Sequence, residues 1–500
     1  MMNLTNFRYS LILLAILAGC SSSDSTPNTV PDNTGDTDTP LIPGDIDGDS
    51  DGDVEAPEVP TASQIIYLDN EAVSLPTGGL FLVSEYIGDL NNDGKGDILA
   101  DTSTFILGSE NSEQDVFASN ERISTALELF SATVLDFNGN GVADILLPNY
   151  EGNLPQSRFG GFDLVLDRSD LSTPIVFDGT NGGRIKGVEP GQENMSFTSV
   201  GDVNGDGRDD LAGYLGGSLT QAGAAMVVLY GANGLPEAEN DVTVFSGSAV
   251  DRLVPANNVR FEGGRVTYVL PLGDINQDGL DDFALRYSYP QGADVEGDRS
   301  FDMLIVYGAT DGIVSVEAFD AETSTSAGTR FADSLIQETA GDFNADGVTD
   351  LVIASETIEG NRTVYSEGVL LGQDWQSQSS FSAAELAEHT ITFTGYGADF
   401  GSIKLHSAGD FNGDGFDDLL VEDAARMILI PAGIVGSVNI IDLNDLPAGS
   451  VEFRASSETD AVYTYEYLDS QADVNGDGFD DLLVYSQSAG VRVLFGKAQF

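Results

Sequence analysis

The segment "VGDVNGDGRDDLAGYL", residues 200–215, places oxygen-bearing side chains at alternate positions. Asp202, Asn204 and Asp206 occupy the first, third and fifth positions of a short motif, and Asp210 occupies the ninth, just before an apolar run. Carboxylates a few ångströms apart repel one another by about 1 kcal/mol per pair even in bulk water. The cluster therefore either binds a cation or is a solvated turn, and one copy does not decide between these two interpretations.

The same motif recurs along the chain as Asp-x-Asn-x-(Asp/Asn)-Gly-x-x-Asp followed by apolar residues. Single clusters of Asp, Asn and Gly are ordinary turn formers. Seven copies in one register, each with a carboxylate at the ninth position, indicate instead a repeated structural unit with one chemistry. The copies start at Asp89, Asp136, Asp202, Asp274, Asp342, Asp410 and Asp473.

The spacing of the motif predicts a Ca²⁺ site in each copy. Ca²⁺ takes six to eight oxygen ligands, whereas Mg²⁺ would tolerate such a wrapped, oxygen-rich loop poorly. Side chains at positions 1, 3 and 5 of a tight loop converge, position 7 offers its backbone carbonyl, and Gly at position 6 allows a turn with positive φ. The acid at position 9 completes the ligand set. The predicted ligands are Asp89, Asn91, Asp93, Lys95 and Asp97; Asp136, Asn138, Asn140, Val142 and Asp144; Asp202, Asn204, Asp206, Arg208 and Asp210; Asp274, Asn276, Asp278, Leu280 and Asp282; Asp342, Asn344, Asp346, Val348 and Asp350; Asp410, Asn412, Asp414, Phe416 and Asp418; and Asp473, Asn475, Asp477, Phe479 and Asp481.

The flanks of the loops predict strands. An EF-hand closes with a Glu at position 12 and enters a helix, but here the ninth residue leads directly into short β-type runs such as "ILA" and "DLLV". Upstream, "VYTYEYLDSQA" alternates in the period of a strand. Downstream, a second apolar run usually ends in Gly, as in "MVVLYG" (226–231). Each unit thus reads as strand, calcium loop, strand, variable connection and strand, with room for a fourth; "SAAELAEH" (382–389) is at most one short helix.

Seven four-stranded units around an axis make an all-β, seven-bladed β-propeller. Residues 63–500 provide about 63 residues per blade, more than a typical WD40 blade. The last loop is followed by only two strand candidates, so we expect the N-terminal segment 63–76 to supply the outer strand of the last blade and close the ring. The competing fold, a linear calcium-binding β-solenoid, has repeats nearer nine residues.

Composition restricts the partners. Hydrophobic residues make up 41% of the chain, enough to bury a core. Acidic residues number 82 against 20 basic ones, which gives a formal charge of −62. This charge should repel nucleic acid and anionic lipid, and it indicates neutralisation by cations, a saline environment, or both. Nucleic-acid binding is excluded on these grounds.

The first residues, "MMNLTNFRYSLILLAILAGCSSS", resemble a bacterial lipoprotein signal. Arg8 precedes an apolar run, 11–18, that is too short to span a bilayer but suits a signal peptide. The resemblance implies that residues 1–19 are removed, that Cys20 is lipidated, and that Ser21 directs the protein to the outer membrane of a Gram-negative bacterium. Cys20 is the only cysteine, so disulfides, thiol catalysis and Cys-based metal sites are excluded.

A linker separates the anchor from the folded part. Residues 20–62 are rich in Ser, Thr, Pro, Asp and Gly, which is typical of an extended acidic tether. Within it, "DIDGDSDGD" (45–53) could bind calcium, but no apolar run follows to fix its shape, and we interpret it as solvated linker. The predicted organisation is signal peptide 1–19, linker 20–62 and propeller 63–500.

The loops also carry a family resemblance. "VGDVNGDGRDDL", "AGDFNADGVTDL" and "AGDFNGDGFDDL" resemble FG-GAP or VCBS-type repeats, the units of the integrin α-subunit propeller. The resemblance covers roughly residues 63–500 and implies a seven-bladed propeller with up to seven Ca²⁺ ions on one face. The loop at Asp136 departs from the pattern, because Asn140 replaces Asp at position 5 and Leu135 replaces the usual preceding Gly. With only Asp136 and Asp144 as carboxylates, we expect it to be the weakest site.

In the proteins it resembles, ligands bind on the face opposite the calcium loops. The candidate segments here are 148–161, 287–300 and 355–368, each with aromatic residues and a scarce Arg that would suit an anionic protein or glycan ligand. The alternative is that they are solvated loops whose Arg residues form local ion pairs. The candidate ligand-face residues are Tyr150, Arg158, Tyr287, Tyr289, Arg299, Arg362 and Tyr365.

The sequence offers few candidate catalytic residues. The chain has two histidines, His389 and His406, and one tryptophan, Trp375; we expect a packed or hydrogen-bonded role for His406. The sequence contains none of the nucleophile-elbow, phosphate-loop, zinc-protease or dinucleotide motifs. We therefore interpret the protein as a lipid-anchored, calcium-binding module that binds or adheres to a protein or glycan. The alternatives are a calcium-dependent polysaccharide lyase or hydrolase, since Asp and Glu pairs abound, and a structural envelope subunit.

Overall fold

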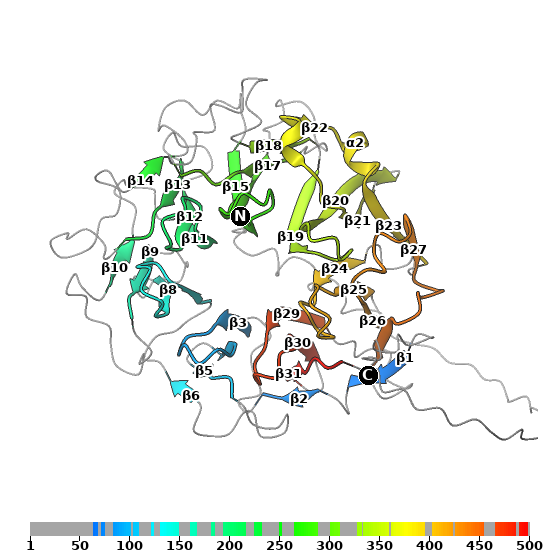
Figure 1. Cartoon of the computed structure of the whole chain (residues 1–500), viewed down its shortest axis with the longest axis horizontal. Coiled ribbons are helices and arrows are strands. Elements are labelled where there is room, and N and C mark those ends of the chain that lie inside the picture. Colours follow the sequence, from blue (N-terminus) through cyan, green and yellow to red (C-terminus); the bar gives the residue numbers. More distant parts are fainter. Residues whose placement is uncertain are drawn as a thin grey trace, which may run out of the picture. The chain divides into compact units, whose positions relative to one another are not determined.

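In the computed structural model, the strand–loop–strand units form seven β-sheets arranged around an axis, as predicted (Figure 1). The sheets belong to one unit, Pro60–Phe500. The described residues are 64–68, 72–75, 84–101, 104–109, 122–124, 131–149, 161–167, 182–185, 194–216, 225–232, 250–252, 265–288, 301–310, 328–332, 334–359, 362–395, 403–423, 426–454, 466–486 and 490–498.

The first four blades follow one another along the chain, each an antiparallel sheet in chain order from the inner strand outward. Blade 1 contains β3 (Glu85–Gly88), β4 (Asp97–Asp101), β5 (Thr104–Ile106) and β6 (Arg122–Ser124). Blade 2 contains β7 (Thr133–Leu135), β8 (Asp144–Asn149), β9 (Gly161–Val165) and β10 (Gly182–Ile185). Blade 3 contains β11 (Asn194–Gly201), β12 (Asp210–Gly216), β13 (Ala225–Leu229) and β14 (Val250–Arg252). Blade 4 contains β15 (Arg265–Gly273), β16 (Asp282–Ser288), β17 (Phe301–Val306) and β18 (Gly328–Phe331).

The remaining three blades complete the ring. Blade 5 contains β19 (Leu335–Gly341), β20 (Asp350–Glu359), β21 (Arg362–Leu370) and β23 (Thr390–Thr394). Blade 6 contains β24 (Lys404–Ser407), β25 (Leu419–Asp423), β26 (Arg426–Ile430) and β28 (Val451–Arg454). Blade 7 contains β29 (Glu466–Ala472), β30 (Asp481–Ser486), β31 (Gly490–Leu494) and, from the N-terminal end of the chain, β2 (Val73–Ser74).

The ring closes through the N-terminal segment, which confirms the sequence prediction. Strand β2 pairs antiparallel with β31, with Val73 opposite Val493. The Leu75 N–H extends this pairing with a 3.1 Å hydrogen bond to the Val491 carbonyl. Blade 7 is therefore built from both ends of the described chain.

Three blades also carry a fifth strand that the sequence did not predict. In blades 4, 5 and 6 a short strand pairs parallel with the fourth strand of the blade: β22 (Ser380–Phe381) with β18, β27 (Ile440–Asp442) with β23, and β1 (Gln64–Tyr67) with β28. Strands β22 and β27 each lie between the third and fourth strands of the following blade. Strand β1 directly precedes β2, the fourth strand of blade 7, and thus repeats the same connection across the ring closure.

Apolar side chains fill the space between neighbouring blades. Between blades 5 and 6, for example, Phe343, Val369, Leu405 and Leu419 pack in one buried cluster. This alternation follows from the strand period, because successive side chains point to opposite faces of a sheet and each face meets the next blade. The packing fixes each inner strand, and with it the loop that follows.

Two local predictions have clear outcomes. The segment 382–389 does contain one short helix, α2 (Ala383–Ala387), which Ser382 and Glu385 cap reciprocally. The interpretation of 355–368 as a loop was wrong, since β20 and β21 pair from Leu351–Leu370 out to Glu359–Arg362 and leave only residues 360–361 between them. The alternation of Thr, Val and Ser in this stretch is compatible with a hairpin.

Candidate metal sites

All seven motif loops lie at the same place in the fold, between the first and second strands of a blade. The ninth residue begins the second strand in six blades and directly precedes it in blade 6. Gly at position 6 has φ between 75° and 92° in every loop, as predicted, and position 4 is also left-handed, with φ between 57° and 75°. Gly adopts this conformation most readily, although Asn92, Gln277 and Ala345 also hold it at position 4. The repeated glycines therefore produce the tight wrapping of the loop.

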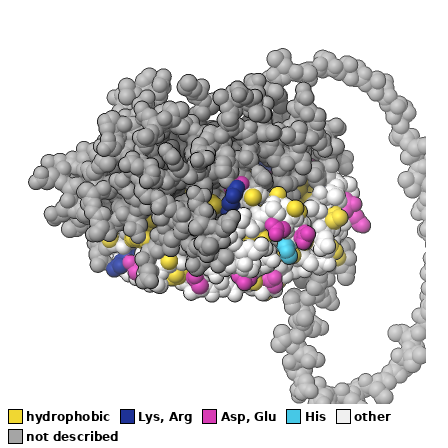
Figure 2. Space-filling view, turned by 90° about the horizontal axis from the view of Figure 1, so that it is seen from above, with side chains coloured by type: hydrophobic (Ala, Val, Ile, Leu, Met, Phe, Trp, Pro, Cys, Tyr) yellow, Lys and Arg dark blue, Asp and Glu magenta, His cyan; other side chains and the backbone are white. Residues whose placement is uncertain are grey.

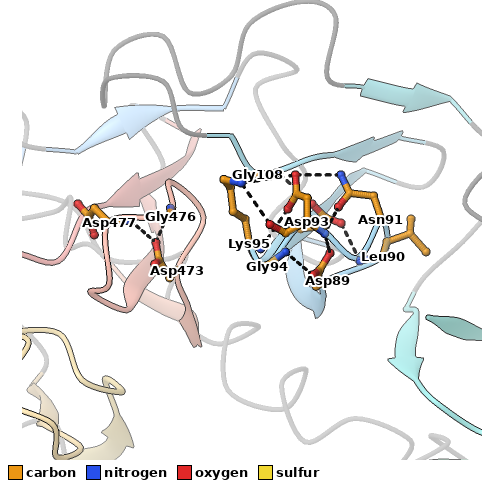
Figure 3. Close-up of polar contacts among 11 residues, drawn as sticks. Asp89, Leu90, Asn91, Asp93, Gly94, Lys95, Gly108, Asp473, Gly476 and Asp477 are labelled. Carbon is orange, nitrogen blue, oxygen red and sulfur yellow. Dashed lines mark hydrogen bonds and ion pairs between the residues drawn. The ribbon is translucent and has the colours of Figure 1, made fainter. Parts of the chain in front are cut away.

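The first loop shows how the side chains are arranged (Figure 3). The two carboxylate oxygens of Asp89 accept hydrogen bonds from the Asp93 N–H at 3.1 Å and the Gly94 N–H at 2.7 Å. Asn91 Oδ1 also accepts from the Asp93 N–H, at 3.0 Å. Asp93 Oδ1 accepts from the Lys95 N–H at 3.0 Å, and its Oδ2 accepts from the Asn91 amide at 3.2 Å. The three predicted side-chain ligands are thus held around one turn of backbone.

The other loops repeat this arrangement. In all seven, the carboxylate at position 1 accepts the N–H of the glycine at position 6, at 2.7–2.9 Å. In all seven, Oδ1 at position 3 accepts the N–H of position 5, at 2.9–3.1 Å. A carboxylate oxygen can accept more than one contact, so these bonds position the oxygens and leave lone pairs for a cation.

The aspartate at position 9 has a second role that sequence reasoning missed. In five loops one of its oxygens accepts the N–H of position 2, as in the 2.8 Å bond from Leu90 to Asp97, and in loops 2 and 6 the N–H of position 3. The other oxygen accepts an N–H at the end of the third strand of the same blade, as in the 2.8 Å bond from Gly108. The residue therefore ties the loop to the blade, and its side chain is fully buried in all seven copies.

The terminal Gly of the third strand has a steric cause. At Gly108, Gly231 and Gly496 an added Cβ would lie 2.6 or 2.7 Å from a backbone carbonyl oxygen of the preceding blade. Glycine permits this close approach, and its N–H then reaches the buried aspartate. The recurrent Gly after the second apolar run is the signal from which this contact could have been inferred.

Burial makes the ninth carboxylates costly to ionise. It raises the pKa of Asp144 to about 6, of Asp97, Asp210, Asp282 and Asp350 to about 7, and of Asp418 to about 8, and it also raises the pKa of Asp481. In the six loops with aspartate at position 5, the carboxylates at positions 1 and 5 raise the pKa of the ninth residue further. A cation in the loop would oppose both effects.

In loop 6, one carboxylate oxygen is available to bind a cation. Asp410 Oδ2 accepts the Gly415 N–H at 2.9 Å, whereas the buried Asp410 Oδ1 makes no hydrogen bond of good geometry, although the nearby Gly413 and Asp414 N–H groups lower the pKa of the carboxyl. A buried anionic oxygen without a partner is costly, and a bound cation would supply that partner. The set of carboxylate, amide and backbone oxygens is the chemistry that Ca²⁺ prefers, so the loop residues fit the predicted ion.

Adjacent loops are joined by a carboxylate at position 8, which sequence reasoning also missed. Asp209 Oδ2 accepts the N–H of Asp136, position 1 of the preceding loop, at 2.6 Å. Asp281, Asp417 and Asp480 make the same bond to Asp202, Asp342 and Asp410, at 2.8–3.0 Å. The sequence signal for this contact is the Asp-Asp doublet within "RDDL", "LDDF" and "FDDL". The first aspartate binds the loop of the preceding blade, and the second is the buried ninth residue of its own loop.

This joint gives a stability prediction. Asp480→Ala removes the only acceptor shown for the Asp410 N–H, and leaving such a group unpaired should lower the free energy of unfolding by about 1–3 kcal/mol. Asp480→Asn retains an acceptor oxygen and should lose less. Chemical denaturation in saturating calcium measures both variants. An alanine variant as stable as the wild type would show that the joint contributes nothing.

Position 7, predicted to offer a backbone carbonyl, also packs its side chain on the preceding loop. A Cβ added to Gly139 would lie 2.7 Å from Arg208 Cγ, and one added to Gly413 would lie 2.3 Å from the Phe479 ring. The Arg208 Nε also donates to the Asn138 carbonyl at 3.2 Å. The loops thus form a continuous set of contacts around the ring.

The predicted ligand face is only partly visible. Tyr287 lies on β16, and Arg362 and Tyr365 lie on β21, but only their backbones are described. Tyr150, Arg158, Tyr289 and Arg299 lie outside the described residues, as do Cys20, the signal peptide and the linker with residues 45–53. The ligand face, the lipid anchor and the domain boundaries therefore stay predictions.

The expected role of His406 as a packed, hydrogen-bonded residue agrees with its surroundings. Its ring stacks on Tyr467 with centroids 4.0 Å apart, and its Nε2 lies 3.4 Å from Glu422 Oε2. Trp375 is buried against Phe331 and Phe381. Neither residue is placed as a catalytic group by these contacts.

In Figure 2, Asp and Glu side chains lie among hydrophobic and other side chains in the described part of the face. Within the described ranges, no three His, Cys, Asp or Glu side chains gather into a metal cluster by themselves, so the candidate sites depend on amide and backbone oxygens as well. None of the helices described here has the length and hydropathy needed to cross a membrane.

Comparisons with known proteins add little to this geometry. No family model matches the chain, and no curated protein matches it. Drosophila Semaphorin 2a is similar with a TM-score of 0.39 and 7% identity, over 87% of this chain and 77% of that chain. The V. cholerae biofilm matrix protein Bap1 has a TM-score of 0.21 and 12% identity, over 82% and 76% of the two chains. The rhamnogalacturonan lyase YesW has a TM-score of 0.21 and 10% identity, over 88% and 91%. Likenesses this distant carry no functional argument, and the FG-GAP resemblance stays a prediction.

Proposed function

We propose that the protein is a calcium-stabilised β-propeller that acts as a binding or adhesion module in the cell envelope. The observation that supports it best is the seven-fold repetition of one loop geometry, in which side-chain oxygens at positions 1, 3 and 5 surround a turn above a buried ninth carboxylate. Repulsion among these carboxylates is a cost that a divalent cation would remove. Seven such ions would change the formal charge from −62 to about −48.

The binding role rests on the division of the propeller into two ends. The seven loops occupy one end of the blades and are used to hold the blades together. We expect the other end to bind the ligand, because the sequence places arginines and tyrosines in and beside the segments that follow the second strands, and these residue types favour recognition of an anionic protein or glycan. A Cys20 anchor would hold this module at the membrane, and Cys20→Ser should release it from the membrane fraction.

Ligand capture tests the binding role. We would pass the purified protein over arrays of glycans and extracellular proteins in millimolar calcium and again in chelator, and expect calcium-dependent capture of one ligand class. Arg158→Ala, Arg299→Ala and Arg362→Ala should reduce capture, whereas Arg454→Ala, on strand β28 and away from the calcium loops, should not. No capture by a folded, calcium-loaded protein would contradict the adhesion role and favour a structural envelope subunit.

A second candidate is a polysaccharide-cleaving enzyme, favoured by one pair of carboxyl groups away from the loops. Burial raises the pKa of Glu367 to about 7, and nearby Glu422 raises it further. Burial also acts to raise the pKa of Glu422, but His406 and Lys404, each 3.4 Å from it, lower that pKa overall. One carboxyl is thus protonated more readily than the other, as in acid–base pairs. Release of unsaturated or reducing ends from the same glycans, abolished by Glu367→Gln, would favour this candidate.

A further inference from the structure

Two of the positions at which blade 2 departs from the other blades lie close together. The loop of blade 2 has Asn140 where the other six loops have aspartate at position 5. The end of its third strand has Asp167, where five blades have Gly and blade 6 has Ala432. The Asp167 N–H still donates to Asp144 Oδ1 at 2.8 Å, so Asp167 occupies the equivalent structural place.

The Asp167 side chain reaches back to the loop. Its Oδ1 accepts the amide N–H of Asn138 at 3.0 Å and that of Asn140 at 2.7 Å. The oxygens of the same amides accept backbone N–H groups, Asn138 Oδ1 from Asn140 at 3.1 Å and Asn140 Oδ1 from Val142 at 2.7 Å. Both amides are therefore fixed with nitrogen toward Asp167, and their oxygens accept the same backbone N–H groups as the Oδ1 atoms of positions 3 and 5 in the other loops.

The substitution pair also conserves charge. Six loops carry carboxylates at positions 1, 5 and 9, and loop 2 carries Asp136 and Asp144 together with Asp167. A third carboxylate is unfavourable here without a cation, because the negative charges of Asp136, Asp144 and Asp167 repel one another across the loop. A loop that had lost its cation would gain nothing from an added negative charge.

We propose that Asp167 is a positioning residue of a cation site in loop 2, which orients the Asn138 and Asn140 oxygens toward the ion and restores the third carboxylate. The inference rests on the proposed calcium function and replaces the expectation that loop 2 is the weakest site. Partners that orient metal ligands in this way typically change metal affinity by about 10- to 100-fold.

Calcium stoichiometry tests the proposal. Native mass spectrometry of the full chain, with free calcium held about threefold above the weakest wild-type dissociation constant, should show seven ions for the wild type and six for Asp167→Asn. Asp136→Ala should also lose one ion, and the double variant no more than one, which would assign both effects to the same loop. Asn140→Asp with Asp167→Gly gives loop 2 the pattern of the other loops and should regain the seventh ion.

A purely structural role for Asp167 predicts a different result. In excess chelator, Asp167→Asn should melt no lower than the wild type, because it removes a repulsive charge. A fall in melting temperature in chelator equal to that in calcium would overturn the inference, and so would six ions on the wild type with Asp167→Asn unchanged. Absence of calcium from every loop would instead overturn the proposed function itself.

Discussion

Chelation of calcium at pH 8 should lower the melting temperature of the protein by about 10 °C. At calcium concentrations tenfold above a dissociation constant of ~0.1–1 mM, each site contributes about 1.4 kcal/mol, so seven sites approach ~10 kcal/mol. A propeller of about 440 residues has an unfolding entropy of about 0.9 kcal/mol/K. With a single cysteine, the protein has no disulfide to compensate. Differential scanning calorimetry with and without chelator measures the shift.

The size of this shift should depend on pH through the buried ninth aspartates. The pKa values of six of them lie at about 6 to 8 in the folded protein, above the ordinary value of 3.8, and burial also raises the pKa of the seventh, Asp481. The folded state therefore binds protons more tightly than the unfolded state, and its stability is greatest at low pH and lost as pH rises through 6 to 8. The calcium-free protein should melt lower at pH 8 than at pH 5, whereas calcium should oppose this loss. The gap between the two melting curves should widen from pH 5 to pH 8.

Two controls separate calcium binding from general screening of the negative charge. Monovalent salt at equal ionic strength screens exposed charges but should leave most of the gap at pH 8, and Mg²⁺ should restore less stability than Ca²⁺. Identical melting temperatures in calcium and chelator at pH 8 would contradict calcium stabilisation. A calcium-free melting temperature that is flat from pH 5 to pH 8 would contradict the cost of ionising the ninth aspartates.

The fold could be predicted from the sequence because its signals are local and repeated. The loop that starts at Asp202 fixes a turn, the residues after Asp210 fix a strand, and seven such units fix a ring of seven blades. The N-terminal strand could be placed by counting, because the last loop is followed by too few strands. The loop glycines, such as Gly207, could be assigned a positive φ from residue type alone.

What could not be predicted involves contacts between units. Asp480 binds the backbone of the preceding loop, and Asp167 reaches Asn140 from 27 residues away. Both need the strand register and the neighbouring blade before their partners are known. Likewise β1 adds to blade 6 although it lies hundreds of residues away in sequence. A repeat motif describes one unit, and these residues join units.

Deletion of residues 64–75 should abolish cooperative folding of the ring, the second large effect we expect. The deletion removes β2 from blade 7 and β1 from blade 6, and with them Leu68 and Leu75, which are 1% and 3% exposed. Each buried leucine contributes about 2–5 kcal/mol by comparison with alanine substitutions. Strands β31 and β28 would also be left as open edges, which favours aggregation. Together these losses approach the whole net stability of a domain.

Truncation at the other side of the same segment is the matched control. A chain that starts at residue 63 keeps β1 and β2 and should have the same melting temperature as the full-length protein. The chain without residues 64–75 should aggregate or show no cooperative transition. Because β2 contributes mainly backbone pairing and apolar contacts, a peptide of residues 63–76 added to the deleted chain should restore a cooperative transition in proportion to its concentration. A deleted chain that melts like the control would show that the ring is held by its inter-blade contacts alone. In that case the seven loops, rather than the shared blade, would be the main closure of the propeller.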